Sequence, residues 1–335
     1  MKKQISFALA MLMALSLAAC GGNAKSSKET SGAASEAAGE KKADASGKVW
    51  KIGAQGPLTG GAAVYGNAVV NGAEIAVNEI NANGGINGYQ IEYKKADDEH
   101  DQEKAINAYN SLKDWGMQFL VGPTTSAPAI AVGTESEPDN MFILSPSGSA
   151  LEVTAPKNVF RVCFSDPAQG AKSAQYIGSH KLGTKIGIIY DSSDVYSTGV
   201  HDSFKEEAPK QGLEIVADEQ FTADSNKDFS TQLQKMKDSG ADLVFLPFYY
   251  TEAALVLTQA NTMGYKPTFF GCDGMDGILN VENFDTKLAE GLMLLTPFAA
   301  DAKDDLTVNF VKNYKENYKD TPIQFAADAY DAVYA

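Results

Sequence analysis

Hydroxyl-bearing and aromatic side chains, together with an acid, follow several apolar runs of this sequence. The residues concerned are Thr124, Thr125, Ser126, Ser147, Gly148, Ser149, the segment from Asp191 to Tyr196, Tyr249, Tyr250 and Asp273. Hydroxyls, rings and an acid suit the binding of a small polar molecule. They do not supply the ligand set of a metal centre or the acid–base pair of a catalytic site.

The other reactive residues do not form a recognisable catalytic or metal site. His100, His180 and His201 lie on separate polar segments, which gives no zinc pattern. Neither a GxSxG nucleophile motif nor a GxxxxGK[ST] phosphate loop occurs. The acids of CDGMDG at 272–277 have the wrong spacing for an EF-hand, and DDEHD at 97–101 is typical of a solvated loop. We therefore expect no enzyme activity, no metal and no cofactor.

The elements that must position these side chains alternate along the chain. Runs typical of strands occupy 49–54, 89–96, 117–122, 141–146, 159–164, 185–191, 213–221, 241–248, 267–271 and 291–298. Helices are expected near 69–80, 102–115, 168–181 and 200–211, and from about 126, 229 and 252. This alternation is typical of parallel sheets covered on both faces. Ligands of such sheets bind beyond the carboxyl ends of the strands, where the polar side chains follow.

The first 48 residues predict the location of the protein. Lys2 and Lys3 precede an apolar run at 5–17 that ends at Cys20, which is the pattern of a secretory signal peptide over 1–19. The small residues before Cys20 resemble the lipobox of bacterial lipoproteins, which implies lipid attachment to Cys20. Ordinary cleavage with an unmodified Cys20 is the alternative. Residues 21–48 contain no Leu, Ile, Val or aromatic residue, so we expect 20–48 to be a flexible linker outside the cytoplasm.

Composition limits the partners of the remaining body. The chain has 335 residues and a formal net charge of −15, and Arg161 is its sole arginine. A strongly acidic chain is a poor nucleic-acid binder. The length beyond residue 48 suits two lobes. Cys163 and Cys272 could form a disulfide, although two buried free thiols are the favoured alternative.

Several segments resemble the leucine/isoleucine/valine-binding proteins of ABC transporters, which are type I periplasmic binding proteins. They are PLTGGAAVYGNAVVNGAEIAVNEINANGGINGYQI at 57–91, FRVCFSDPAQGAKSA at 160–174, IGIIYDSSDVYSTG at 186–199 and DLVFLPFYYTEAALVLTQA at 242–260. The resemblance implies an α/β fold of two doubly wound parallel-sheet lobes joined by a hinge. It places the N-terminal lobe at 49–163, the C-terminal lobe at 164–296 and a return to the first lobe at 297–335.

The same resemblance implies a function. A monomeric, lipid-anchored solute-binding protein would close over a small amino acid, most simply a branched-chain one, and deliver it to a permease. A receptor that senses amides, urea or other small polar solutes is the alternative. An acid at Asp273 favours a ligand with an ammonium group, and Thr124 and Thr125 leave room for a polar amino acid.

The residues expected to contact the ligand are Tyr65, Ser126, Ser147, Gly148, Ser149, Tyr196, Tyr250 and Asp273. Ser126 is expected at the start of a helix, where its hydroxyl and amide would hold the ligand carboxylate; a plain N-cap serine is the alternative.

The resemblance implies the other roles. Ser147 matches a backbone carbonyl that binds the ammonium, and Ser149 matches a hydroxyl shared by both charged groups, although a simple polar turn would also explain them. Asp273 matches an ammonium-binding acid that is often Glu in the family. The three tyrosines match rings that pack on the ligand, with core packing as the alternative.

Two features depart from the family pattern. The family continues beyond the motif that resembles FAADAYDAVYA at 325–335, whereas this sequence stops at Ala335 within a helical pattern, so we expect the last segment to be incomplete. Some relatives carry a cysteine pair in the first lobe. The corresponding segments here, 97–102 and 122–126, contain no cysteine.

Overall fold

Two five-stranded sheets, each made of parallel strands, form the framework of residues 48–335, which are the residues that the computed structural model describes. Sheet 1 contains β1 (Trp50–Gly56), β2 (Ile91–Asp97), β3 (Phe119–Val121), β4 (Phe142–Ser145) and β5 (Val159–Arg161), in the order β2-β1-β3-β4-β5. Sheet 2 contains β6 (Lys185–Asp191), β7 (Glu214–Phe221), β8 (Leu243–Leu246), β9 (Thr268–Gly271) and β10 (Met293–Leu294), in the order β10-β9-β8-β6-β7. The signal peptide at 1–19, Cys20 and nearly all of the 20–48 linker lie outside the described residues.

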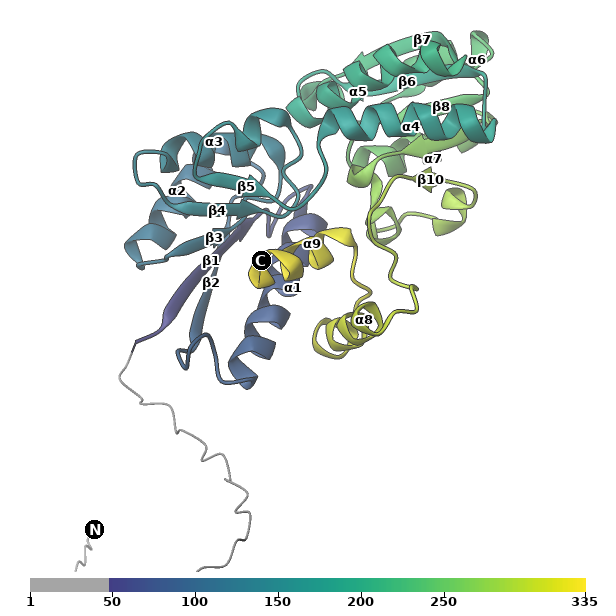
Figure 1. Cartoon of the computed structure of the whole chain (residues 1–335). Helices are drawn as coiled ribbons and strands as arrows, with labels where there is room; N and C mark the ends of the chain where they lie inside the picture. The colour runs from purple at the N-terminus through teal and green to yellow at the C-terminus, as the bar shows by residue number, and fades with distance from the viewer. Residues whose placement is uncertain (1–47) are drawn as a thin grey trace, which may run out of the picture. The chain divides into compact units, whose positions relative to one another are not determined.

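Helices connect successive strands (Figure 1). The α-helices are α1 (Ala63–Ala82), α2 (Gln102–Asp114), α3 (Ser126–Ser136), α4 (Asp166–His180), α5 (Val195–Glu207), α6 (Ser230–Asp238), α7 (Tyr250–Thr262), α8 (Asp305–Tyr318) and α9 (Gln324–Tyr334). The 3₁₀ helices are η1 (Leu151–Thr154), η2 (Ala208–Gln211), η3 (Ala223–Ser225), η4 (Asp273–Met275), η5 (Ile278–Asn280) and η6 (Thr286–Ala289). None of the helices described is both long and apolar enough to span a membrane.

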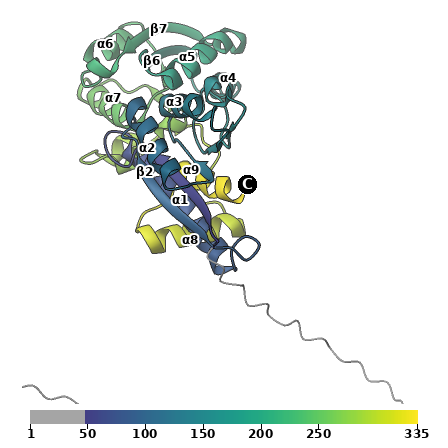
Figure 2. The same ribbon diagram turned by 90° about the vertical axis from the view of Figure 1, so that its left-hand side faces the viewer.

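Both faces of sheet 1 are covered by helices, as the alternation of its buried residues requires (Figures 1 and 2). Leu120 and Ile143 pack in one apolar cluster with α2 and α3. Their neighbours Val121 and Leu144 pack in another cluster with α1 and α9. Successive strand residues point to opposite faces, so the two clusters lie on opposite sides of the sheet. Sheet 1 and these helices form the first lobe.

Sheet 2 is built in the same way. Ile188 and Phe245 pack with residues of α4 and α5, whereas Ile189, Val244 and Leu246 pack with α6 and α7. Sheet 2 and these four helices form the second lobe. The expected α/β fold with two parallel-sheet lobes is confirmed. The exact lobe boundaries at 163/164 and 296/297 stay a prediction.

The expected strand at 291–298 is wrong in extent, because only Met293 and Leu294 pair with β9. Gly291 adopts a positive φ of 83°, and the amide of Leu292 donates to the carbonyl of Ala289 in a turn. The apolar run therefore starts in a turn, and most of it serves as a connection that leads to α8. Helix α8 was not among the helices expected from the sequence.

Candidate ligand-binding site

A small cavity lies where the carboxyl ends of strands from both lobes meet. Its free volume in this conformation is about 10 Å³, which is about what one water molecule needs. Its lining residues are Tyr65, Thr124, Thr125, Ser126, Ser147, Ser149, Tyr196, Tyr249, Asp273, Gly274 and Phe325. Hydroxyls dominate the contribution of the first lobe, whereas the second lobe contributes an acid and two tyrosines.

Ser126 is the first residue of α3, and its side chain ties two loops of the first lobe together. Its Oγ accepts the amides of Ser149 and Ala150, each at 3.2 Å. Thr125 occupies the N-cap position of α3, so Ser126 is not a plain N-cap serine. Among the residues described, the Ser126 hydroxyl has no hydrogen-bond acceptor, so its proton is available for an anion at the positive end of α3.

Ser147 lies beside this helix end on the loop after β4. Its hydroxyl donates to the carbonyl of Thr124 at 2.7 Å, which joins the loop after β3 to the loop after β4. Gly148 follows, and its amide donates to Ser145 Oγ at 3.0 Å. A Cβ at Gly148 would lie 2.7 Å from that same Oγ, so this tight turn requires glycine.

Asp273 is the acid that the second lobe contributes to the cavity. Its side chain is only 4% exposed. Oδ1 accepts the Tyr196 hydroxyl at 2.7 Å and the Gly274 amide at 2.8 Å. Burial raises the pKa of Asp273 to about 6, although the hydrogen bonds from Tyr196 and Gln169 partly offset that rise. The carboxylate is therefore mostly ionised at pH 7 and is suited to bind a cation.

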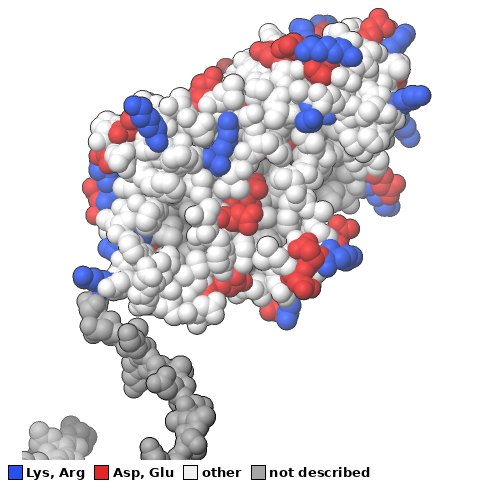
Figure 3. Space-filling view, in the orientation of Figure 1, with Lys and Arg blue, Asp and Glu red and all other residues white. Residues whose placement is uncertain are grey.

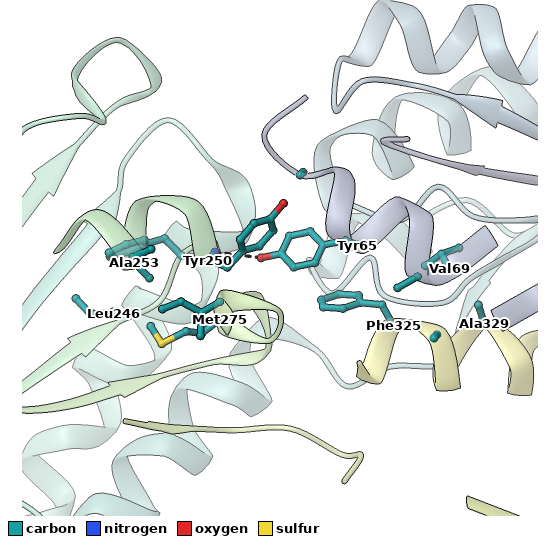
Figure 4. Packing of buried hydrophobic residues seen from close by; sticks show 14 of the residues in the cluster. Tyr65, Val69, Leu246, Tyr250, Ala253, Met275, Phe325 and Ala329 are labelled. Carbon is teal, nitrogen blue, oxygen red and sulfur yellow. Dashed lines mark hydrogen bonds between the residues drawn. The ribbon is translucent and has the colours of Figure 1, made fainter. Parts of the chain in front are cut away.

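Tyr65 connects the two lobes at the cavity. Its hydroxyl donates to the carbonyl of Gly274 and accepts the amide of Tyr250 at 3.2 Å. Figure 4 shows Tyr65 on α1 pointing toward Tyr250, with Phe325 beside it on α9. The Tyr65 and Phe325 ring centroids are 4.4 Å apart. On the second lobe, the Tyr249 ring stacks on Tyr196 at 5.2 Å.

Six of the eight expected contact residues line this one cavity, namely Tyr65, Ser126, Ser147, Ser149, Tyr196 and Asp273. Gly148 and Tyr250 do not. Gly148 shapes the loop that carries its two serine neighbours, and the Tyr250 hydroxyl accepts the amide of Val64 at 3.3 Å. Tyr249 lines the cavity where Tyr250 was expected. Contact of any of these residues with a ligand stays a prediction.

Phe325 and Gly274 line the cavity without having been expected there. Gly274 directly follows Asp273, so its place next to the acid could have been inferred. Phe325 lies on α9, which does not follow a strand. The site was expected to form from polar residues that follow strands. Phe325 is neither polar nor placed after a strand, so this expectation did not include it.

The two first-lobe segments that lack the cysteine pair are joined by a hydrogen bond. His100 Nδ1 lies 2.8 Å from Thr125 Oγ1. The His100 ring also contacts Tyr249 of the second lobe, with the ring centroids 5.5 Å apart. Cys163 and Cys272 are free thiols, so the alternative of a disulfide between them is wrong.

Comparison with known proteins places these features in one family. The family model described as "Periplasmic binding protein" matches residues 49–335. The Leu/Ile/Val-binding protein homolog 3 of Brucella melitensis is 32% identical over 226 residues, which is 67% of this chain and 61% of the relative. The aligned part thus spans less than two thirds of that relative's length.

Two further matches cover more of the chain. The leucine-, isoleucine-, valine-, threonine- and alanine-binding protein of Pseudomonas aeruginosa is 28% identical over 84% of this chain and 75% of its own length. The crystal structure of LivJ from Streptococcus pneumoniae in complex with isoleucine superposes with a TM-score of 0.80 and 33% identity, and covers 86% of this chain and 82% of that chain.

Proposed function

Because the chain belongs to the type I periplasmic binding proteins of the branched-chain amino-acid family, we propose that it binds a small amino acid in the cavity between its lobes and delivers it to an ABC transporter permease. The family consists of solute-binding proteins and not of enzymes. The proposal concerns the ligand, the residues that hold it and the delivery step.

One observation carries the proposal: a hydroxyl at the start of α3 and an acid from the second lobe line the same small cavity. A free amino acid is a zwitterion, and burying either of its charges without a partner is costly. Ser126 and the amides of the first turn of α3 offer donors to the ligand carboxylate. Asp273 offers a carboxylate to the ammonium. The two partners come from different lobes, so both are engaged only when the lobes are closed.

The rest of the lining favours a small side chain that is not strongly polar. Tyr65, Tyr249 and Phe325 present rings, which form an apolar wall. Thr124 and Thr125 add hydroxyls to the lining, which would tolerate threonine as well as valine. The names of the relatives agree with this range, since one includes threonine and alanine and a solved relative holds isoleucine.

Closure of the lobes is the mechanism that this arrangement supports. Ligand binding would shift an open–closed equilibrium toward the closed form, in which Tyr65 joins α1 to Gly274 and Tyr250. Lipid on Cys20 and a linker over 20–48 would keep the protein at the outer face of the membrane, close to the permease. The anchor rests on the sequence of a segment outside the described residues.

A thermal-shift screen tests the choice of ligand. We expect leucine, isoleucine, valine or threonine to raise the melting temperature of the protein among the twenty amino acids, urea and short amides. Stabilisation by urea or amides alone would instead favour the sensing receptor that is the alternative function.

A further inference from the structure

His100 lies next to the ligand cavity, and the backbone around it is strained. His100 and Glu99 both adopt positive φ angles, of 61° and 51°. Residues other than glycine seldom do so, and such strain persists where surrounding bonds hold it, often at binding sites. Here the His100 amide donates to Asp98 Oδ1 at 3.0 Å, and Asp98 is completely buried. A strained histidine that is held this firmly calls for a functional explanation.

The His100 ring contacts one cavity-lining residue in each lobe. In the first lobe, its Nδ1 lies 2.8 Å from Thr125 Oγ1. In the second lobe, the ring lies edge-on to Tyr249, with the ring centroids 5.5 Å apart and an interplanar angle of 86°. Thr125 and Tyr249 line the cavity, whereas His100 does not. His100 can therefore act on a ligand only through these neighbours.

The Thr125 hydroxyl depends on His100 for its hydrogen bond. Thr125 is the N-cap residue of α3, but its side chain makes no capping bond. Among residues 48–335, His100 is the sole hydrogen-bond partner of this hydroxyl, and Thr125 is only 4% exposed. The cavity beside it has a free volume of about 10 Å³, which leaves room for about one water molecule. A ligand that fills the cavity therefore leaves no water to bind the Thr125 proton.

Two neighbouring hydroxyls of the first lobe are already satisfied within the protein. Thr124 Oγ1 donates to the Gln55 carbonyl at 3.3 Å, and Ser147 Oγ donates to the Thr124 carbonyl at 2.7 Å. A carbonyl only accepts, so both hydroxyl protons are engaged without a ligand. Hydroxyls paired in this way do not require a polar partner from the ligand. An unpaired buried donor does require one, because leaving it unmet is costly.

The surroundings of the His100 ring favour Nδ1 as a hydrogen-bond acceptor. The ring also lines a second cavity, whose charged residues are Glu99, Asp191, Asp194 and Glu252. Burial lowers the pKa of His100, although the charges of Asp191 and Asp101 partly offset this effect. The ring is thus neutral at pH 7 and carries a proton on one nitrogen. Acids beside the ring favour that proton on Nε2, because a carboxylate accepts hydrogen bonds. Nδ1 is then left to accept from Thr125.

We propose that His100 is a positioning residue that accepts the Thr125 hydroxyl at Nδ1, and that this bond lets an apolar side chain bind against a wall of hydroxyls. The inference rests on the proposed binding of an amino acid and deepens it, because it names a residue that determines side-chain specificity. With the Thr125 proton engaged, closure over leucine or valine buries no unpaired donor. Without His100, the same closure buries one.

This role concerns binding more than folding. When the lobes are open, water reaches Thr125 and can accept its proton whichever residue occupies position 100. When the lobes close over an apolar side chain, that water is excluded and His100 is the acceptor that remains. Loss of Nδ1 should therefore weaken ligand binding with little effect on the melting temperature of the ligand-free protein.

Calorimetric titration with L-leucine compares the wild type with His100→Phe, Thr125→Val and the double variant. His100→Phe keeps a ring against Tyr249 but removes Nδ1, and Thr125→Val keeps the shape of the side chain without the hydroxyl. We expect His100→Phe to bind leucine about tenfold more weakly, because closure then buries an unpaired donor. The double variant should bind within about twofold of the wild type, since removal of both partners is nearly neutral. A purely structural role of His100 would leave the double variant with the full loss.

His180→Phe is the matched control, because it removes an exposed histidine of the second lobe. Its leucine affinity should equal that of the wild type. Nitrogen NMR spectra of isotope-labelled wild-type protein with leucine bound report the tautomer directly, whether or not the variants fold. We expect His100 to show an unprotonated Nδ1 and a protonated Nε2 at pH 7.

The inference and the proposed function fail in different ways. Wild-type affinity in His100→Phe, a loss that persists in the double variant, or a proton on Nδ1 would each overturn the role of His100 and leave amino-acid binding intact. A wild-type protein that binds none of the twenty amino acids would contradict the proposed function, and the inference with it.

Discussion

At the scale of single residues, the first lobe presents a hydrogen-bond donor to the cavity and the second lobe presents an acceptor. Ser126 Oγ accepts the amides of Ser149 and Ala150, and within residues 48–335 no acceptor binds its hydroxyl proton. The Asp273 carboxylate accepts hydrogen bonds, and its Oδ1 is fixed by those from the Tyr196 hydroxyl and the Gly274 amide. Groups held this firmly lose little entropy when a ligand arrives.

Replacing the acid of the second lobe tests its role directly. We expect Asp273→Asn to weaken the binding of leucine by at least ~1.5 kcal/mol, or about tenfold, because it removes a charge-assisted bond to the ammonium. Glu282→Gln, which changes an exposed acid of the same lobe, is the control. Equal affinities of the two variants by calorimetry would remove Asp273 from the site.

The pKa of Asp273 also predicts how binding depends on pH. The ammonium pairs with the ionised carboxylate, whereas burial keeps the carboxyl protonated below a pKa of about 6. Affinity should therefore rise as pH increases toward 6, by about tenfold per unit at most, since one proton must leave. Asp273→Asn should lack this acidic limb in calorimetric titrations from pH 4.5 to 7. A wild-type affinity that is constant over this range would be inconsistent with the role of Asp273.

At the scale of elements, α1 is the part of the first lobe that reaches the second lobe. Tyr65 on α1 bonds to Gly274 and Tyr250. The residues before the helix add a further contact, since the Thr251 hydroxyl donates to the carbonyl of Gly61 at 3.0 Å. These bonds stabilise the closed form in addition to any bond with the ligand.

Tyr65→Phe separates this effect from packing, because it keeps the ring and removes only the hydroxyl. We expect leucine affinity to fall about fivefold to thirtyfold, since two net hydrogen bonds of about 0.5–1 kcal/mol each are lost from the closed form. Tyr93→Phe is the control, because the Tyr93 hydroxyl donates to the Val70 carbonyl at 2.7 Å within the first lobe. Equal losses of affinity in both variants would show that Tyr65 does not act between the lobes.

The contact of α9 with α1 positions Phe325 at the cavity. A Cβ added at Gly72 would lie 2.0 Å from the carbonyl oxygen of Ala326, so the two helices approach too closely for any side chain at this position. We expect Gly72→Ala to lower the free energy of unfolding by about 1–3 kcal/mol through overpacking. Gly61→Ala should not, because a Cβ there meets no atom within 4 Å. Urea denaturation measures both, and a Gly72→Ala variant of wild-type stability would contradict the close contact.

The order of elements explains why much of the site could be predicted from the sequence. Parallel strands end at one edge of a sheet, so the residues after β3 and β4 had to come together, as Ser126 and Ser149 do. Tyr250 was expected where Tyr249 lies, because the choice depends on the residue at which α7 begins, and the sequence pattern does not define that residue. Phe325 reaches the cavity only through packing of α9 on α1, which no local pattern of the sequence encodes.

At the scale of the whole molecule, acidic residues outnumber basic ones, and several acids are buried. The sequence has 43 acidic residues and 28 Lys and Arg residues. On the face drawn in Figure 3, basic side chains are dispersed among acidic ones and do not form a continuous stripe.

The buried acids predict how stability depends on pH. Burial raises the pKa of Asp98 to about 7, and those of Asp166 and Asp328 to about 8, above the ordinary value of 3.8. The folded protein thus binds more protons than the unfolded chain between about pH 4 and 8, so stability falls as pH rises through this window. We expect the melting temperature without ligand to fall by at least about 4 °C from pH 5 to pH 9.

Scanning calorimetry at several pH values measures this dependence. The double variant Asp166→Asn and Asp328→Asn should show a shallower decline, because the two buried carboxyls with a pKa of about 8 no longer titrate. A melting temperature that rises over the same range would contradict the assignment of these carboxyls as protonated.

A crystal structure with the amino acid that stabilises the protein most is the most direct test of the central claim. The account predicts one ligand molecule in the closed cavity, with its carboxylate at the Ser126 hydroxyl and its ammonium within hydrogen-bond distance of Asp273. A ligand bound elsewhere, or one held in this cavity by neither residue, would contradict the account.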